Sequence, residues 1–396
     1  MRPAIVLLLA LAQVPSLRDR TRDLHRQAFV FDAHVHVVNR HLYRGGSMGE
    51  RSELGQVDLP RMIEGGVDAL FFTLFVTEDY YPQRYETKQV LRLIDEAHRQ
   101  LELNRDKIGL ALNAADIERL NRQGKIAAVL DLEGGFDMDG DLRVLRMLHR
   151  LGLRSFQLSA HNYGNQFAEP CCATSQVKGL TEQGRAVVRE ANRLGMVINV
   201  SHASQAAIEQ AVEASSDPVV STHDGLKFFN DIPRTMSEQT LRKLAAKGGL
   251  IGFHIGNEFH NRALFEYRTQ KAGKPFWDRE DVHRAAPRSL AEIDRKVGPQ
   301  FPSVGLKNPP AELIYNVEQW FRAVDKAIEW VGEDHVILGT DFDGGPTLPT
   351  PMRDIRDLPW LTQAMLNKGY SEARIRKFLG GNLLRVFRQV TEKGSR

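Results

Sequence analysis

The chain of 396 residues is poor in cysteine and in net charge. Its only two cysteines, Cys171 and Cys172, are adjacent. Neighbouring cysteines rarely bond without backbone strain, so a disulfide scaffold is excluded and a packing role is expected for both. The net charge is +3, and no basic stripe alternates with aromatic residues, which argues against nucleic acid as a partner.

Long apolar runs are also missing, apart from a short one at the amino terminus. After Arg2, residues 4–12 are apolar and end in Ala-Leu-Ala, a small-x-small pattern typical of a secretory cleavage site. The run is too short to span a bilayer as a helix. We therefore predict a signal peptide over residues 1–15 and a periplasmic or secreted protein without a membrane anchor. A cytoplasmic protein with a frayed amino terminus is the alternative.

Eight short apolar segments alternate with amphipathic, helix-like segments. The predicted strands are residues 30–37, 67–75, 126–132, 155–158, 197–200, 219–221, 250–253 and 336–339. This alternation predicts an α/β fold, a single (β/α)8 barrel of the TIM type over residues 16–396. A doubly wound open sheet is the competing class, but it would usually carry a Gly-rich turn after the first strand, where this chain has histidines.

One long segment interrupts the alternation between the seventh and eighth predicted strands. Residues 256–310 are rich in charge, glycine and proline. We interpret this segment as an irregular insertion that forms a lid or an oligomer contact, because long loops inside a compact domain are usually functional.

The first predicted strand contains a pair of histidines. Residues 31–38 read FDAHVHVV, so His34 and His36 stand two positions apart in an apolar run. Side chains alternate along a strand, so both imidazoles should face the same side. They are either two core histidines satisfied by backbone partners or half of a metal site. Ligands at matching places downstream decide between these readings.

Such ligands stand at or just beyond the ends of later predicted strands. They are Glu133, His161, His202, His223 and Asp341. In a barrel the carboxyl ends of the strands meet on the face that holds the active site. Together with the histidine pair of the first strand, His202, His223 and Glu133 offer four imidazoles and one carboxylate. These are too many ligands for one tetrahedral catalytic ion, and they suit two divalent ions if Glu133 bridges them. Zinc fits these ligands best, with manganese, cobalt and iron as alternatives.

A pair of metal ions also predicts the chemistry. His34 and His36 would hold one ion, and His202 and His223 the other. Two cations a few ångströms apart can share a hydroxide and lower its pKa towards neutrality, which supplies a nucleophile for hydrolysis. Asp341 would take the proton and pass it to a leaving amine. Its alternative role is that of a weakly bound sixth ligand.

These residues resemble those of a known family, the renal or membrane dipeptidases of the amidohydrolase superfamily. The similarity runs from Asp32 through almost the whole chain. It includes the motifs DLEGG (131–135), LSAHNYGN (158–165), GLTEQGRAVVREANRLGMVINVSHAS (179–204), STHDG (221–225), GEDHVILGTDFDGG (332–345) and GGNLLRVF (380–387). The resemblance implies a barrel with a binuclear zinc centre that hydrolyses dipeptides, often with a D-residue at the C-terminal position. The expected partner is a small dipeptide, and homodimerisation is left open.

The resemblance also implies roles for single residues. It assigns metal binding to His34, Glu133, His202 and His223. The histidine on the oxyanion side falls on His161, and the catalytic aspartate on Asp341. The arginine that grips the substrate carboxylate falls on Arg234, and a planar guanidinium suits that task. A surface ion pair is the alternative for this arginine.

Two positions depart from the family pattern, and they leave a second function open. His36 stands where the family usually has an aspartate, which removes a negative charge near the first ion and predicts a different metal affinity or identity. His254 stands near the place of a substrate-contacting tyrosine. Because His-x-His is the commoner superfamily pattern, hydrolysis of an N-acyl amino acid, a cyclic amide or a lactone is the alternative function. A non-enzymatic role is disfavoured, since Glu133 and Asp341 are both present.

Overall fold

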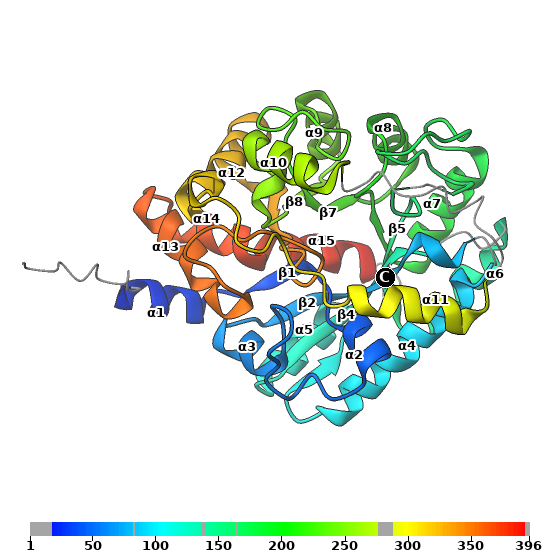
Figure 1. Ribbon diagram of the computed structural model, residues 1–396, viewed down its shortest axis with the longest axis horizontal. Coiled ribbons are helices and arrows are strands. Elements are labelled where there is room, and N and C mark those ends of the chain that lie inside the picture. Colours follow the sequence, from blue (N-terminus) through cyan, green and yellow to red (C-terminus); the bar gives the residue numbers. More distant parts are fainter. Residues whose placement is uncertain (1–17, 82–83, 136–139, 163–164, 276–287, 393–396) are drawn as a thin grey trace, which may run out of the picture.

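The computed structural model describes residues 18–81, 84–135, 140–162, 165–275, 288–392 of the chain (Figure 1). The predicted signal peptide at residues 1–15 lies outside the described residues. Within the described ranges, no helix combines the length and the apolar character needed to cross a membrane.

Eight parallel strands form a nearly closed barrel, which confirms the predicted fold. They are β1 (Phe31–Val35), β2 (Ala69–Val76), β4 (Ile126–Gly134), β5 (Leu153–Gln157), β6 (Val197–Asn199), β7 (Val220–Asp224), β8 (Leu250–Phe253) and β9 (Val336–Leu338), paired in that order. The backbone N–H groups of His36 and Asp341 join the two ends of the sheet, donating to Phe342 O and His34 O at 2.9 Å each. This closure brings the residues after β9 next to the histidine pair of β1.

One strand escapes sequence-based prediction. β3 (Ile108–Leu110) pairs only with β4 and lies off the main order of strands. It has three residues with a glycine in the middle, too few for an alternating or continuous apolar pattern to stand out.

Helices surround the strands in the view of Figure 1. Those outside the 256–310 segment are α1 (Asp19–Gln27), α2 (Val38–Arg44), α3 (Leu59–Glu64), α4 (Glu86–Leu103), α5 (Ala114–Arg122), α6 (Leu142–Arg150), α7 (Glu182–Leu194), α8 (Gln205–Ala214), α9 (Glu238–Ala246), α12 (Val317–Val331), α13 (Pro359–Asn367), α14 (Glu372–Arg376) and α15 (Asn382–Thr391). Ser204 and Ser237 accept hydrogen bonds from the first turns of α8 and α9. Both therefore act as helix N-caps, because a serine side chain satisfies an otherwise unpaired backbone N–H group there.

The segment 256–310 is more regular than the sequence predicted. Its described residues include α10 (Arg262–Ala272) and α11 (Leu290–Val297). The side chain of Asn261 caps α10, and Ser289 forms a reciprocal capping box with Glu292 at the start of α11. These caps start helices in a segment whose charge and glycine content suggested irregular chain.

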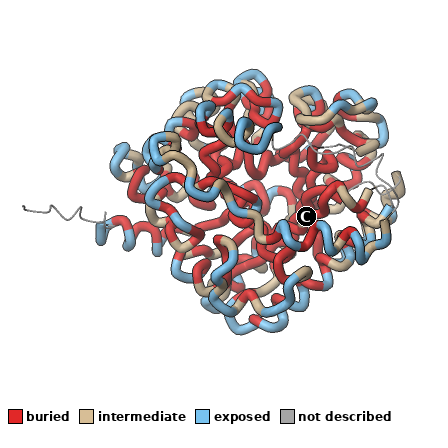
Figure 2. Tube along the Cα trace, viewed as in Figure 1, coloured by how far each residue is buried: buried red, intermediate tan, exposed pale blue. Residues whose placement is uncertain are grey.

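Apolar side chains fill one end of the barrel. Burial is concentrated at the centre of the molecule and exposure at its rim (Figure 2). Near the amino ends of the strands, Phe31, Phe71 and Val129 belong to one apolar cluster with Val386 and Phe387 of α15. The amino-terminal end of the barrel is thus filled with apolar side chains, and the carboxyl-terminal end remains for polar groups.

Cys171 and Cys172 are bonded to each other, so the expectation of two packing thiols was wrong. The chain bends at residues 171–173, which brings the two side chains together. A bond between neighbours closes no loop, so it does not act as a scaffold. Cys171 N–H also donates to His202 O at 2.7 Å, which places the bonded pair directly behind a site histidine.

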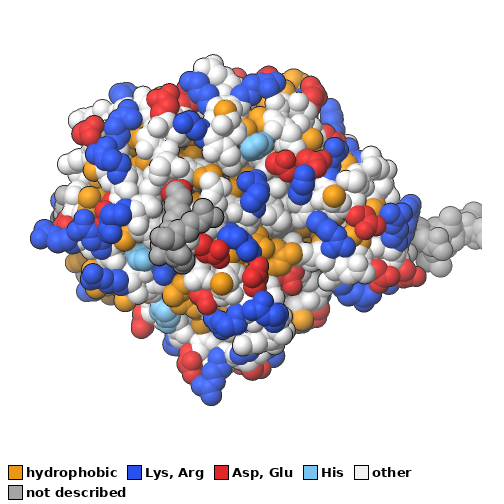
Figure 3. Space-filling view, turned by 180° about the vertical axis from the view of Figure 1, so that it is seen from behind, with side chains coloured by type: hydrophobic (Ala, Val, Ile, Leu, Met, Phe, Trp, Pro, Cys, Tyr) orange, Lys and Arg blue, Asp and Glu red, His pale blue; other side chains and the backbone are white. Residues whose placement is uncertain are grey.

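The surface carries charges of both signs. Figure 3 shows basic and acidic side chains interspersed over the face opposite the view of Figure 1. Such a mixture does not form a field of one sign over that face.

Candidate metal centre

The predicted site residues converge at the carboxyl ends of the strands. Left-handed backbone conformations help to place three of them, with φ of 55° at His161, 65° at His202 and 61° at Asp341. This region is uncommon for residues other than glycine and stores strain that the surrounding fold must offset. Sharp turns directly after the strands thus aim these side chains into the barrel mouth.

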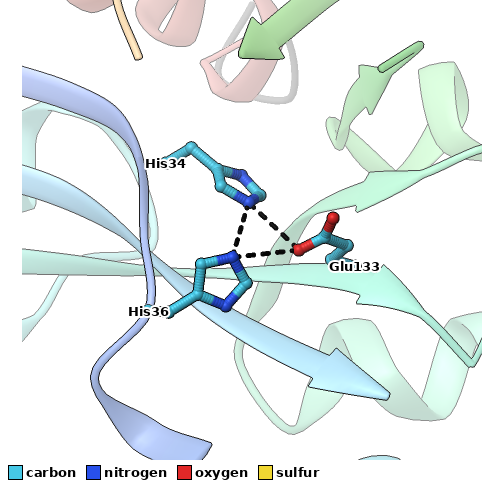
Figure 4. Close-up of side chains that lie close together, drawn as sticks. All are labelled: His34, His36 and Glu133. Atoms are coloured by element: carbon cyan, nitrogen blue, oxygen red, sulfur yellow. Dashed lines mark hydrogen bonds and ion pairs between the residues drawn. The ribbon is translucent and has the colours of Figure 1, made fainter. Parts of the chain in front are cut away.

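His34, His36 and Glu133 form the first cluster (Figure 4). The Nε2 atoms of His34 and His36 lie 3.1 Å apart, and each lies 3.1 Å from Glu133 Oε2. All three side chains are buried. Two imidazole nitrogens and one carboxylate oxygen at these separations can share one divalent ion, because Zn–N and Zn–O bonds measure about 2 Å.

A second cluster surrounds the other oxygen of the same carboxylate. His202 Nε2 lies 3.1 Å and His223 Nε2 3.7 Å from Glu133 Oε1, and the two nitrogens lie 3.0 Å apart. His161 Nε2 is 3.6 Å from that oxygen, and Glu133, His161 and His202 together also meet the spacing of a metal-binding group. Each oxygen of one carboxylate thus faces its own set of imidazoles.

The outer contacts of three histidines fit metal binding. His202 Nδ1 pairs with Asn162 Oδ1 at 2.9 Å, and His223 Nδ1 with Thr222 Oγ1 at 3.0 Å. His34 Nδ1 lies 3.4 Å from Asp131 Oδ2. Such partners fix the ring and leave Nε2 as the ligand atom. The donor set therefore suits one or two divalent ions.

His36 differs in this respect. Its Nδ1 is buried and has no hydrogen-bond partner among the described residues. The ring is held by the edge of Phe75, at a centroid distance of 5.7 Å, and by its Nε2 contacts. His36, where the family resemblance predicts an aspartate, is thus also without a polar anchor behind its ring.

The two histidine pairs have opposite electrostatic character. Burial opposes charge on His34 and His36, but Glu133, Asp131 and Asp341 outweigh it and raise their pKa values to about 10 and about 9. Burial instead lowers the pKa values of His202 and His223 well below the ordinary value. Metal must therefore displace protons at the first pair but meets neutral imidazoles at the second.

The acidic groups respond to the same environment. Burial disfavours the charged form of Glu133, yet the surrounding histidines, His34 and His202 foremost, hold its pKa well below the usual range. For Asp341 the burial penalty is outweighed by His254 and His36, which lower its pKa in the same way. Both acids are therefore carboxylates at neutral pH.

Asp341 is held between two histidines. Its Oδ2 lies 2.8 Å from His254 Nε2, and its Oδ1 lies 2.9 Å from His36 Nε2. Gly256 N–H donates to His254 Nδ1 at 2.8 Å, which makes Nδ1 the acceptor and Nε2 the protonated nitrogen. His254 thus donates a hydrogen bond that orients Asp341.

Asp343, two residues further on, has a different task. Its Oδ1 accepts a hydrogen bond from Gln56 N–H, and its Oδ2 lies 3.6 Å from Arg40 Nη1. Burial raises its pKa to about 7. The residue ties two loops together and does not line the cavity.

Sequence reasoning missed Glu78 and Asn162. The buried Glu78 carboxylate pairs with His161 Nδ1, and Asn162 orients His202. A signal for Glu78 was present, because it lies two residues beyond the end of β2 and so obeys the same strand-end rule as the other site residues. Asn162 directly follows His161 in the sequence.

Arg234 is buried. Its side chain is 1% exposed, its Nη2 donates to His223 O at 2.7 Å, and its Nη1 lies 3.4 Å from Asp224 Oδ2. Its guanidinium stands 5.5 Å from the centre of the Phe259 ring. Phe259 lines the cavity and Arg234 does not.

A cavity of about 190 Å³ opens over the cluster. The site residues His36, Glu133, His161, His202, His223, His254 and Asp341 line its floor and sides together with Phe75. The 256–310 segment adds Phe259, Arg268 and Phe301 to the wall. A lining of polar groups and aromatic rings suits a small ligand with a polar reacting centre.

The fold and the cluster together define a parallel barrel with a site of the metal-binding type at the carboxyl ends of its strands. The family model "Membrane dipeptidase (Peptidase family M19)" matches residues 18–396. The chain belongs to this family of metallopeptidases, as the sequence resemblance predicted.

Curated relatives carry related names. Dipeptidase tcpJ of Claviceps purpurea is 28% identical over 346 residues, which cover 85% of this chain and 70% of the relative. Dipeptidase 3 of Rattus norvegicus is 26% identical over 398 residues, covering 96% of this chain and 68% of the relative.

Solved structures share the fold. The probable dipeptidase PvdM from Pseudomonas aeruginosa has a TM-score of 0.77 at 21% identity, and the match covers 94% of this chain and 98% of that one. A metallo peptidase from Rhodobacter sphaeroides, liganded with a phosphinate mimic of the dipeptide L-Ala-D-Ala, has a TM-score of 0.69 at 23% identity and covers 92% and 99%.

The unusual His36 gives a prediction about metal affinity. In His36→Asp, the first site gains a carboxylate and loses one imidazole whose proton competes with the metal. Because the pKa of His36 is about 9, that competition costs roughly 10- to 100-fold in affinity at pH 7. Metal titrations from pH 6 to 9 should show tighter first-site binding in the variant and a pH slope shallower by about one proton. Parallel slopes in the two proteins would contradict this explanation.

Proposed function

We propose that this chain is a dipeptidase that hydrolyses the peptide bond of dipeptides with two divalent metal ions, zinc first among them. The observation that carries the proposal is the position of Glu133, whose two carboxylate oxygens each face a separate pair of imidazoles. His34 and His36 would hold one ion, and His202 and His223 the other. Ions bound there would polarise the scissile carbonyl and lower the pKa of a shared water.

The protein's own groups would then handle protons and charge. Asp341, oriented by His254 Nε2, takes up a proton on the cavity side and passes it to the leaving amine. His161 would donate a hydrogen bond from Nε2 to the developing oxyanion. The buried Glu78 carboxylate contacts His161 Nδ1 and fixes the ring for that task.

The cavity limits the substrate. A volume of about 190 Å³ is small compared with typical drug-sized pockets of roughly 300–1,000 Å³, which favours a short substrate. The Rhodobacter sphaeroides neighbour holds a mimic of L-Ala-D-Ala, so dipeptides with a C-terminal D-residue belong in the proposed range. The substrate-carboxylate role of Arg234 stays a prediction.

A second reaction of the same chemistry is favoured by one observation. The His34–His36 pair is a His-x-His arrangement, which the wider superfamily uses for other amides and for lactones. Purified protein should therefore be assayed with L-Ala-L-Ala, L-Ala-D-Ala, an N-acetyl amino acid, a cyclic amide and a lactone. Preferential cleavage of the dipeptides supports the proposal, and cleavage of the other compounds alone would replace it with the second reaction.

A further inference from the structure

The bond between Cys171 and Cys172 is not explained by the fold. Neighbouring residues are already joined through the backbone, so a bond between their side chains closes no long loop and adds little through loop entropy. These two residues are the only cysteines in the sequence, and both are partly exposed. A disulfide within reach of solvent is more open to thiol exchange than one sealed in a core.

The backbone of the bonded pair is joined to a histidine of the second metal cluster. Pro170 and Ala203 form an antiparallel bridge, and beside it Cys171 N–H donates to His202 O at 2.7 Å. His202 has a left-handed backbone conformation, with φ 65°. Such a conformation persists only where the surrounding structure holds it. The hydrogen bond from Cys171 is therefore part of what holds His202 at the cavity.

The side chain of Cys171 meets the same histidine by a second route. Its Sγ lies 3.7 Å from Asn162 Oδ1, and that oxygen pairs with His202 Nδ1 at 2.9 Å. A ring that binds metal through Nε2 carries its proton on Nδ1, so the oxygen accepts from it. A sulfur in a disulfide has no hydrogen and leaves this acceptor to His202. A thiol at the same place is a donor and competes for it.

We propose that Cys171 and Cys172 form a redox-active pair that controls metal binding at the second site. The inference rests on the two-ion centre of the proposed function and adds a means of regulating it. The co-reactant is a dithiol. One of its thiolates attacks a sulfur of the pair, which breaks the S–S bond and forms a mixed disulfide. Its second thiol resolves that intermediate, so the dithiol is oxidised to a disulfide while two electrons and two protons convert the pair to thiols.

Reduction acts on one metal site only. It releases the bend at residues 171–173, which loosens the hydrogen bond from Cys171 N–H to His202 O, and the new S–H group competes for the acceptor of His202 Nδ1. Loss of such an outer partner lowers metal affinity by about 10- to 100-fold. The first site is not affected in this way, because His34 is backed by Asp131.

Zinc titrations of the oxidised and the reduced protein test the inference. Protein purified without reductant is stripped of metal, and its free thiols are counted with a thiol reagent. One half is reduced with dithiothreitol and then freed of it under argon, because thiolates themselves bind zinc. Both halves are titrated with zinc, and hydrolysis of L-Ala-L-Ala is followed in parallel. The double variant Cys171→Ser/Cys172→Ser is the matched control, since the sequence has no other cysteine on which the reductant can act.

We expect no free thiols before reduction and two after it. The zinc affinity of one site should fall by about 10- to 100-fold on reduction and recover on reoxidation, while the other stays unchanged. The double variant should bind zinc like the reduced protein, with or without reductant. In Asp131→Asn, whose first site is weakened, reduction should lower the higher of the two affinities, which identifies the second site.

Three results would overturn the inference: two free thiols before reduction, equal zinc titrations in the two states, or a loss of affinity at both sites together. The last result would show general unfolding instead of a local link to His202. The comparison of oxidised with reduced wild type needs no variant, so it holds even if the double variant does not fold. Failure of the oxidised protein to cleave L-Ala-L-Ala would contradict the proposed function, whereas the zinc titrations alone decide this inference.

Discussion

Asp341→Asn is expected to lower kcat for dipeptide hydrolysis by about 10²- to 10⁴-fold, the range that general acid–base groups contribute. Asparagine keeps the shape of the side chain and tolerates the left-handed conformation at this position, φ 61°. It can still accept a hydrogen bond from His254 Nε2 but cannot take up and return a proton. Metal content should stay at the wild-type level, as measured by elemental analysis of the purified variant.

A neighbouring aspartate provides the control for this variant. Asp343 is also buried and left-handed, with φ 64°, but lies outside the cavity lining. Asp343→Asn keeps the acceptor for Gln56 N–H and should retain kcat within about threefold, since no proton transfer is assigned to it. If Asp341→Asn lost metal together with turnover, Asp341 would be a ligand, as its 2.9 Å contact with His36 allows. Retained turnover would remove it from the mechanism.

Glu133→Gln should have the widest effect of any single substitution. Its two oxygens face both histidine pairs, so one change weakens both metal sites. The amide is neutral and presents only one acceptor oxygen. We expect metal affinity at both sites to fall by more than the roughly 10- to 100-fold that the loss of an outer-shell partner costs. Dipeptide hydrolysis should be lost with it.

Asp131→Asn offers a contrast on the same strand. Asp131 lies behind the first site only, 3.4 Å from His34 Nδ1. Its substitution should lower the metal affinity of the first site by about 10- to 100-fold and leave the affinity of the second site unchanged. Metal titrations of the two variants distinguish a shared ligand from a local one. Two full equivalents of tightly bound metal in Glu133→Gln would contradict a bridging role.

The sequence was most informative where physical signals repeat along the chain. Apolar strands and polar residues at their ends follow one rule. That rule led to the barrel and to His34, His36, Glu133, His161, His202, His223 and Asp341. The same rule could have indicated Glu78, which lies just beyond β2, but the adjacent acids Glu78 and Asp79 did not stand out as site residues. The three-residue strand β3 was too short for a pattern to stand out.

Other features depend on contacts that no local pattern contains. The place of Arg268 in the cavity wall follows from its pairing with Glu258 and from the start of α10 at Asn261. The burial of Arg234 against Asp224, the carbonyl of His223 and the Phe259 ring depends on how loops pack against each other. The bond between Cys171 and Cys172 depends on a local bend of the chain. The sequence does not reveal this bend, and the bond was not expected because adjacent cysteines rarely bond without backbone strain.

Metal removal and return tests whether hydrolysis depends on two ions joined by Glu133. The purified protein is stripped with a chelator, assayed with L-Ala-L-Ala, and then titrated with zinc while hydrolysis is followed. We expect the stripped protein to be inactive and activity to return fully only when two equivalents per chain are bound. Full activity in the stripped protein, or full recovery at one equivalent, would contradict a dipeptidase centre in which Glu133 joins two ions.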